Sequence, residues 1–208
     1  MKKALLIIPL LLAVWGGYAL FAPGPSIRNA APTGRNLICF GDSLTFGTGA
    51  SKGGDYPSRL AAMVAYPVIN AGVPGDTTAD ALKRLERDVL SRSPRMVLLT
   101  LGGNDLKNRI RRETAFDNLR AIVEAIQDAG ALVVIGGVDI PLYGRGFDEA
   151  YRDLAEETGS VLIPNVLKDI MGKRDRMSDP IHPNDAGYAV MARRFYEAIE
   201  PYLDMGTP

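Results

Sequence analysis

Nearly continuous apolar runs recur along this 208-residue chain, and longer amphipathic stretches separate them. The runs lie at residues 36–40 (NLICF), 96–101 (MVLLTL) and 131–138 (ALVVIGGV). A strand with one face in water alternates apolar and polar residues, whereas a strand covered on both faces does not need to. The pattern therefore predicts an α/β fold in which helices cover both faces of a parallel sheet.

The spacing of apolar residues predicts where the other elements lie. Two more short strands are expected at residues 67–70 and 161–163. Helices, in which apolar residues recur every three or four positions, are expected at residues 56–64, 78–90, 114–128, 147–158 and 187–202, with a helical turn at 166–171. Side-chain caps are expected at Asp76 or Thr77 and at Asn184 and Asp185.

The beginning of the chain differs from the rest. Two lysines precede an uncharged apolar stretch over residues 4–22, which is the pattern of an export signal and is also long enough to cross a bilayer. We therefore expect residues 1–22 to be a signal peptide or an N-terminal membrane anchor. Residues 23–35, rich in Pro and Gly, are expected to be a linker, and residues 36–208 the folded domain. Such a protein would be periplasmic or secreted, or anchored in the inner membrane.

The charge balance and the rarity of histidine and cysteine argue against several classes of function. Lys and Arg together number 24, as do Asp and Glu, so no net field attracts nucleic acid. The single histidine, His182, and the single cysteine, Cys39, cannot build a His-rich zinc site or an intrachain disulfide. Lys52 stands where a dinucleotide-binding motif starting at Gly47 would need glycine. We expect no cofactor and no metal, and we expect Cys39 to be a buried core residue.

Polar segments follow the predicted strands. They lie at residues 41–49, 71–78 and 102–105, and a fourth, 178–184, precedes the last helix. Ligands of parallel α/β sheets bind at the carboxyl ends of the strands. The four segments are therefore the place to look for a functional site.

Ser43 lies in the first of these segments, directly after a buried strand. A serine in that position can point up from the sheet edge, but it needs a base to be nucleophilic near neutral pH. Thr45 stands where the G-x-S-x-G elbow of other hydrolases needs glycine. Taken alone, a serine that caps a turn or helix is the simpler interpretation.

Asp179 and His182 lie three residues apart in the last segment. That spacing can place a carboxylate against one imidazole nitrogen and leave the other free to take a proton. Caps at Asn184 and Asp185 would account for the start of the last helix without these two residues. The middle segments hold Gly75 and Asn104, whose backbone N–H and side-chain amide are donor types suited to an oxyanion, although Gly and Asn are also common in ordinary turns.

Together the four segments resemble the four sequence blocks of the SGNH (GDSL-type) hydrolases, in the same order and at similar separations. The matching stretches are G-D-S-L at 41–44, N-A-x-x-x-G-D-T at 70–77, G-G-N-D at 102–105 and D-x-x-H-P at 179–183. The resemblance covers residues 36–203 and is closest to the bacterial branch that holds the multifunctional acyl-CoA thioesterase, arylesterase and lysophospholipase. It implies a three-layer α/β/α, flavodoxin-like fold with a five-stranded parallel sheet, and a serine hydrolase that cleaves acyl esters or thioesters.

The resemblance also implies a role for each matching residue. Ser43 resembles the nucleophile, His182 the general base and then acid, and Asp179 the residue that orients the imidazole. The backbone N–H groups of Ser43 and Gly75 and the side chain of Asn104 resemble the three oxyanion donors. No departure from the family pattern falls on these positions. Asp42 and Asp105 are instead expected to hold loop amides.

The region after Asn104 borders the acyl pocket in the resembled branch, and we therefore expect Leu106 and Ile110 to contact substrate. The stretch Tyr143-Gly144-Arg145 also resembles that branch, and Tyr143 is expected to contact substrate as well. The loop 106–112 also carries basic side chains that would suit an anionic head group, or that simply begin the next helix in solvent. We expect a monomer that acts on a small acyl ester or thioester, with membrane attachment only through residues 4–22. The alternatives are a carbohydrate O-deacetylase or acyltransferase with the same triad, a non-catalytic binding module, and an envelope-anchored interaction protein.

Overall fold

Five parallel strands form the centre of the molecule. The structure is a computed structural model that describes residues 26–139 and 146–205. In these residues the strands are β1 (Asn36–Gly41), β2 (Val68–Gly72), β3 (Pro94–Thr100), β4 (Leu132–Gly136) and β5 (Val161–Ile163). They pair side by side, all parallel, in the order β2-β1-β3-β4-β5.

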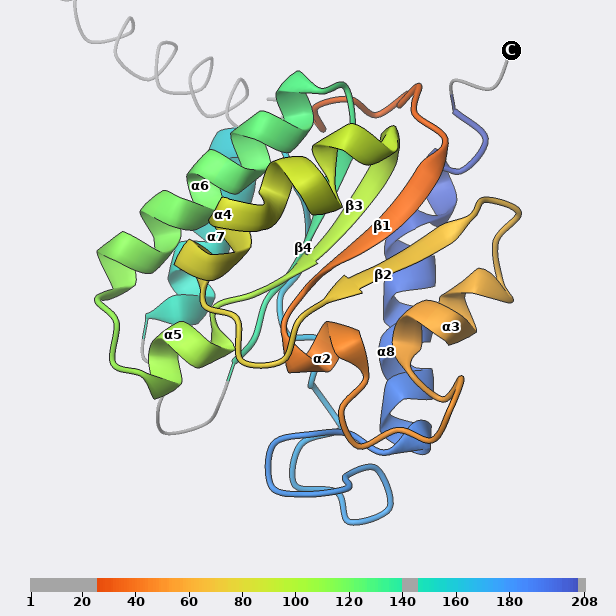
Figure 1. Ribbon diagram of the computed structural model, residues 1–208, viewed down its shortest axis with the longest axis vertical. Helices are drawn as coiled ribbons and strands as arrows, with labels where there is room; N and C mark the ends of the chain where they lie inside the picture. Colours follow the sequence, from red (N-terminus) through yellow and green to blue (C-terminus); the bar gives the residue numbers. More distant parts are fainter. Residues whose placement is uncertain (1–25, 140–145, 206–208) are drawn as a thin grey trace, which may run out of the picture.

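Helices cover both faces of the sheet (Figure 1). One face packs against α4 (Thr78–Asp88), α6 (Arg112–Asp128) and α7 (Phe147–Thr158). The other packs against α3 (Tyr56–Ala61) and α8 (Asp185–Ile199). Shorter elements are α2 (Ser43–Phe46), α5 (Gly103–Lys107) and the 3-10 turns η1 (Leu90–Arg92) and η2 (Glu200–Tyr202).

The two faces of the sheet explain the continuous apolar runs. Along β1, Leu37 and Cys39 contribute to the core under α3 and α8, whereas Ile38 and Phe40 contribute to the core under α4, α6 and α7. Successive side chains of a strand point to opposite faces, and both faces here are covered, so apolar residues are favoured at successive positions. The same partition recurs along β3.

The strand order places a crevice beside β1. The chain runs from β1 outward to β2, crosses back to β3, and then continues outward through β4 to β5. This is the flavodoxin-like order, in which ligands bind outside the carboxyl ends of the strands where the direction of winding reverses. In Figure 1, α2 and α5, which directly follow β1 and β3, lie at that end of the sheet.

The expected fold is confirmed, and its differences from expectation are local. The strand 161–163 and the helix 147–158 have the expected bounds, and other ends move by a few residues. The helices α2 and α5 were not expected, because four or five residues are too few to show a helical period. Residues 166–171, expected as a helical turn, instead form consecutive turns that continue to residue 172.

Residues 26–35 form no helix or strand and lie against the domain. Asn29 donates from Nδ2 to the carbonyls of Gln127 and Ala131 at 2.8 and 2.9 Å. The carbonyl of Pro32 accepts from buried Arg95 at 2.6 Å. Residues 1–22, expected as a signal or anchor, lie outside the described residues. Within residues 26–139 and 146–205, no helix is long and apolar enough to cross a membrane.

Candidate active site

Ser43 lies at the carboxyl end of β1, as the first residue of α2. The preceding residue, Asp42, is the N-cap of that helix, and its Oδ1 accepts from the N–H of Leu44 at 3.0 Å. The strand ends in the buried Gly41 and the helix begins two residues later, so the Ser43 side chain emerges at the sheet edge, half-buried.

The only histidine of the chain contacts this serine. His182 Nε2 lies 3.0 Å from Ser43 Oγ, although the two residues are 139 positions apart in the sequence. The other ring nitrogen, Nδ1, lies 2.7 Å from Asp179 Oδ2. A hydroxyl, an imidazole and a carboxylate in this order can transfer the hydroxyl proton to the ring during nucleophilic attack.

Asp179 holds both the ring and the backbone of His182. Its Oδ1 accepts from the N–H groups of Ile181 and His182, each at 2.8 Å, while Oδ2 contacts the ring. These hydrogen bonds, that from His182 first, lower the pKa of Asp179 to about 2. The carboxylate is therefore ionised at neutral pH and can accept a hydrogen bond from the neighbouring ring nitrogen.

Asn104 lies on α5, at the end of β3, and its amide is held in place by two acceptors. Nδ2 donates to the carbonyl of Asp76 at 2.9 Å and to Asp42 Oδ2 at 3.3 Å. The turn before it requires glycine, because Gly102 has a φ of 113° and a Cβ there would lie 2.3 Å from the hydroxyl oxygen of Tyr151. That hydroxyl in turn donates to the carbonyl of Leu101.

Gly75 lies at the exposed corner of the turn between β2 and α4. The N–H of Asp76 donates to the carbonyl of Val73 at 3.2 Å, with Pro74 and Gly75 between them. Gly75 has a φ of 89°, which suits glycine at the third position of a type II turn. The Asp76 carbonyl ties this turn to Asn104, but Gly75 itself does not line the cavity beside Ser43.

An apolar cavity of about 580 Å³ opens beside Ser43, Asn104 and His182. Leu106 and Ile110, expected to contact substrate, both line it; Leu106 belongs to α5 rather than to a loop. Tyr143 lies outside the described residues. Five further apolar residues line the cavity without having been expected there, and they come from four parts of the chain: Leu44, Val138, Leu167, Met171 and Ile181. Two of them lie inside a motif, Leu44 in G-D-S-L and Ile181 in D-x-x-H-P, so the sequence indicated their location; the other three had no such signal.

The two other acidic residues near the site hold backbone amides, as expected. Asp105 is fully buried and accepts from the N–H of Thr78 at 2.9 Å, which joins α5 to the start of α4. Asp42 is 3 % exposed, and burial raises its pKa to about 7.

Cys39 is buried in β1, and burial raises the pKa of its thiol, so it is a core residue. Among the described residues, no group of three His, Cys, Asp or Glu side chains could hold a metal ion.

Comparison with known proteins places this geometry in a family. The model of the GDSL-like lipase/acylhydrolase family matches residues 39–190. The chain belongs to this family. It is 30% identical over 176 residues to thioesterase 1/protease 1/lysophospholipase L1 of Escherichia coli K12, which covers 81% of this chain and 85% of that protein. It is 31% identical over 165 residues to an arylesterase of Vibrio mimicus, covering 74% and 82% of the two chains.

A solved structure agrees with this family assignment. The crystal structure of TesA superposes with a TM-score of 0.77 at 27% sequence identity, covering 81% of this chain and 99% of that one. The GDSL-like family and the ester-cleaving relatives identify the chain as a hydrolase that cleaves esters. They also confirm the resemblance and the fold drawn from the sequence.

Proposed function

We propose that this GDSL-like hydrolase cleaves acyl esters or thioesters through an acyl-enzyme on Ser43. Ser43 Oγ attacks the acyl carbonyl while His182 Nε2 takes its proton, and His182 then gives that proton to the leaving alcohol or thiol. Water activated by the same imidazole releases the acid and restores Ser43. The observation that carries the proposal is the 3.0 Å contact between His182 Nε2 and Ser43 Oγ, with Asp179 on the other ring nitrogen.

The oxyanion of the tetrahedral intermediate needs donors that are already aimed at it. We assign the backbone N–H groups of Ser43 and Gly75 and the Nδ2 of Asn104 to this task. Both hydrogens of Asn104 Nδ2 have acceptors in this structure, and the bond to Asp42 is the longer one at 3.3 Å. We therefore assign the hydrogen facing Asp42 to the oxyanion, while the bond to the Asp76 carbonyl keeps the amide in place. Contacts of this kind tighten when substrate binds.

Kinetics of single variants test this assignment. Ser43→Ala and His182→Ala should each lower kcat on a p-nitrophenyl ester by about 10⁴-fold or more, because the members of such a triad act as a unit. Asn104→Ala should lower kcat by about 10²- to 10³-fold, as expected for one oxyanion donor. Wild-type turnover in folded Ser43→Ala protein would refute the mechanism.

The cavity favours acyl chains longer than acetyl. Its walls are mostly apolar side chains, which would leave an acetyl group with few contacts, and this argues against a carbohydrate O-deacetylase. Lys107 and Arg109 line the same cavity and would attract an anionic alcohol or thiol moiety. We expect kcat/KM to rise at least about 10-fold from acetate to octanoate p-nitrophenyl esters, since each buried methylene adds roughly 1 kcal/mol. A preference for acetate would favour the deacetylase instead.

We also propose that the protein is exported, with residues 1–22 as its signal or anchor. The support is the sequence of that segment: two lysines followed by 19 residues without a charge. The mass of the protein isolated from its native host tests the proposal. A mass short by the N-terminal segment indicates cleavage, the full mass in the membrane fraction indicates an anchor, and the full mass in the cytosol contradicts export.

A further inference from the structure

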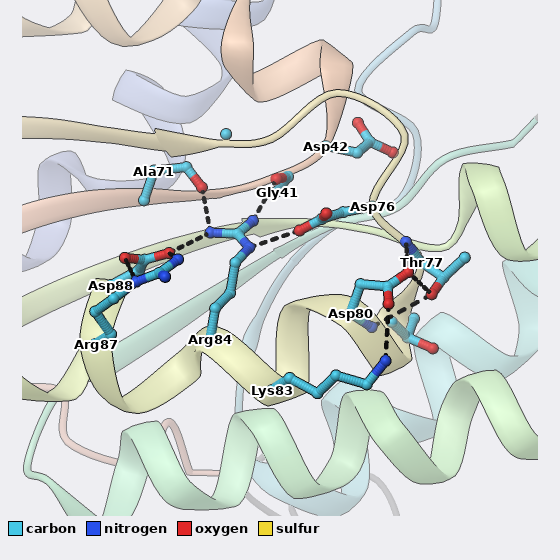
Figure 2. A network of polar contacts seen from close by, with 12 residues as sticks. Gly41, Asp42, Ala71, Asp76, Thr77, Asp80, Lys83, Arg84, Arg87 and Asp88 are labelled. Atoms are coloured by element: carbon cyan, nitrogen blue, oxygen red, sulfur yellow. Dashed lines mark hydrogen bonds and ion pairs between the residues drawn. The ribbon is translucent and has the colours of Figure 1, made fainter.

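A buried arginine lies directly behind the candidate site and contacts the segments that form it. Arg84 is on α4 and is 9 % exposed. Figure 2 shows its guanidinium between the ends of two strands: Nη2 donates to the carbonyl of Gly41 and Nη1 to that of Ala71, each at 2.9 Å. Nε donates to Asp76 Oδ2 at 2.5 Å, and Nη1 also reaches Asp88 Oδ2 at 3.1 Å.

Two of these contacts, Gly41 and Asp76, lie close to the proposed oxyanion donors. Gly41 is two residues before Ser43 at the end of β1. Asp76 directly follows Gly75, and its carbonyl accepts from Asn104 Nδ2. The guanidinium therefore touches, directly or through one residue, all three segments from which the donors come.

The geometry of the contacts requires an arginine. The guanidinium is a planar fork with five N–H donors, and here it meets four acceptors from three parts of the chain while it lies 4.4 Å from the centre of the Phe40 ring. A lysine ammonium is a compact point charge on a flexible stem and cannot span the same acceptors. Asp76 and Asp88 balance the buried positive charge.

We propose that Arg84 is a positioning residue of the oxyanion site, acting through Gly41 and Asp76. The inference rests on the proposed function, because it assumes that Ser43, Gly75 and Asn104 stabilise an oxyanion. Arg84 does not line the cavity and does not touch the space where substrate would bind. It fixes the relative position of the β1 end, the Gly75 turn and the Asn104 amide.

This role predicts a specific kinetic change. Substrate binding in the cavity does not involve Arg84, so Arg84→Lys should leave KM within about 2-fold of wild type. A small displacement of oxyanion donors weakens contacts that matter only in the transition state, so kcat should fall by about 10- to 100-fold. The inhibition constant of an alkyl boronic acid, whose adduct with Ser43 places an oxygen among these donors, should rise by a similar factor.

Arg95 offers a matched control in the same protein. It is also buried, at 3 % exposed, and it lies 4.7 Å from the centre of the Tyr66 ring. It donates to backbone carbonyls as well, those of Pro32, Leu203 and Met205. Arg95 is near the start of β3, at the opposite end of the sheet from Asn104. Arg95→Lys should therefore lower the melting temperature without changing kcat at 25 °C.

The experiment compares wild type, Arg84→Lys and Arg95→Lys in melting temperature, kcat, KM and boronic-acid inhibition. Wild-type kcat in Arg84→Lys would overturn the proposal, as would an equal loss of kcat in folded Arg95→Lys. Should Arg84→Lys not fold, Asp76→Asn takes its place, because it keeps the Asp76 carbonyl and weakens the ion pair with Arg84. Asp76→Asn must then show the same loss of kcat with unchanged KM, and wild-type kcat overturns the proposal.

The positioning role and the proposed function can fail separately. An active Ser43→Ala variant removes the proposed function and the inference together. An inactive Ser43→Ala variant beside a fully active Arg84→Lys variant overturns only the inference.

Discussion

At the scale of single residues, Asp42 is the carboxyl group, among the described residues, whose pKa the fold shifts furthest from its ordinary value. It lies between the nucleophile's helix and the Asn104 amide, and it accepts hydrogen bonds from Leu44 and Asn104. Burial outweighs the hydrogen bond from Leu44 and raises the pKa of Asp42 from 3.8 to about 7. The uncharged form of a carboxylic acid is favoured when water is excluded from it.

Asp42 should make the free energy of unfolding depend on pH. Between pH 3.8 and 7 the folded state holds a proton that the unfolded chain has lost. The contribution of Asp42 to the free energy of unfolding is therefore greatest below pH 3.8 and falls as the pH rises to 7, by up to about 4 kcal/mol. Urea unfolding across that range should show the fall in wild type and a flatter profile in Asp42→Asn. The same slope in both proteins would contradict this ionisation.

The residues of the site differ in how far the sequence alone could place them. Four residues could be placed because each belongs to a motif next to a predicted strand or helix. The structure brings these four together: Ser43, Asn104, Asp179 and His182. Asp179 was expected to contact the ring, but its hydrogen bonds to two backbone amides depend on turn geometry that spacing does not reveal. No sequence pattern indicated that Arg84 is buried, because a charged residue on an amphipathic helix is ordinarily assigned to the face that contacts solvent.

At the scale of elements, His182 depends on a loop docked on the start of α8. The N–H of Ser178 donates to the carbonyl of His182 at 2.9 Å, and Met177 and Pro183 form an isolated antiparallel bridge. Asn184 caps α8 through Oδ1 and donates from Nδ2 to carbonyls of the same loop. Asp185, also expected as a cap, is the first residue of α8 and instead accepts from the N–H and hydroxyl of Ser51.

Loss of the Asn184 side chain should affect both stability and turnover. Asn184→Ala removes the cap and two bonds to the loop, so we expect a loss of about 1–2 kcal/mol in the free energy of unfolding and about a 10-fold fall in kcat. Asp55→Ala is the matched control, because Asp55 caps α3 by accepting from the N–H of Ser58 and lies outside the cavity lining. It should lose similar stability at unchanged kcat. Equal kcat in the two variants would show that the cap does not position His182.

Element types followed from periodicity, but element ends did not. The strands could be predicted because burial on both faces favours apolar residues at successive positions. The ends depend on single hydrogen bonds, such as the capping box in which Thr77 and Asp80 satisfy one another's backbone at the start of α4. Spacing left Asp76 and Thr77 as equal candidates for that cap. The structure gives the cap to Thr77 and pairs Asp76 with Arg84.

At the scale of the whole molecule, the two ends of the sheet carry different tasks. Ser43 and Asn104 follow the carboxyl ends of β1 and β3. The two ends of the described chain meet at the opposite end of the sheet, where the strands begin. Arg95 joins Pro32 to Leu203 and Met205 there. Residues 26–35 thus complete the domain at the end opposite the site, although their composition predicted a linker.

Removing residues 26–35 should weaken the fold without disturbing the site. A chain that begins at residue 36 leaves buried Arg95 without the Pro32 carbonyl and loses the bonds from Asn29, a cost of about 2–4 kcal/mol. Its melting temperature should lie roughly 5–10 °C below that of a chain that begins at residue 26. We expect equal kcat for the two chains at 25 °C. Equal melting temperatures would show that this segment is only a tether.

Labelling with a fluorophosphonate tests most directly whether these far-apart segments form one nucleophilic site. The serine oxygen displaces fluoride from phosphorus, and the adduct is read as added intact mass and located by peptide mapping. We expect one equivalent of label on Ser43 in wild type, none in Ser43→Ala, and labelling slowed by at least about 10³-fold in His182→Ala. Label on another residue, or equal labelling of Ser43→Ala, would contradict an acyl-enzyme on Ser43.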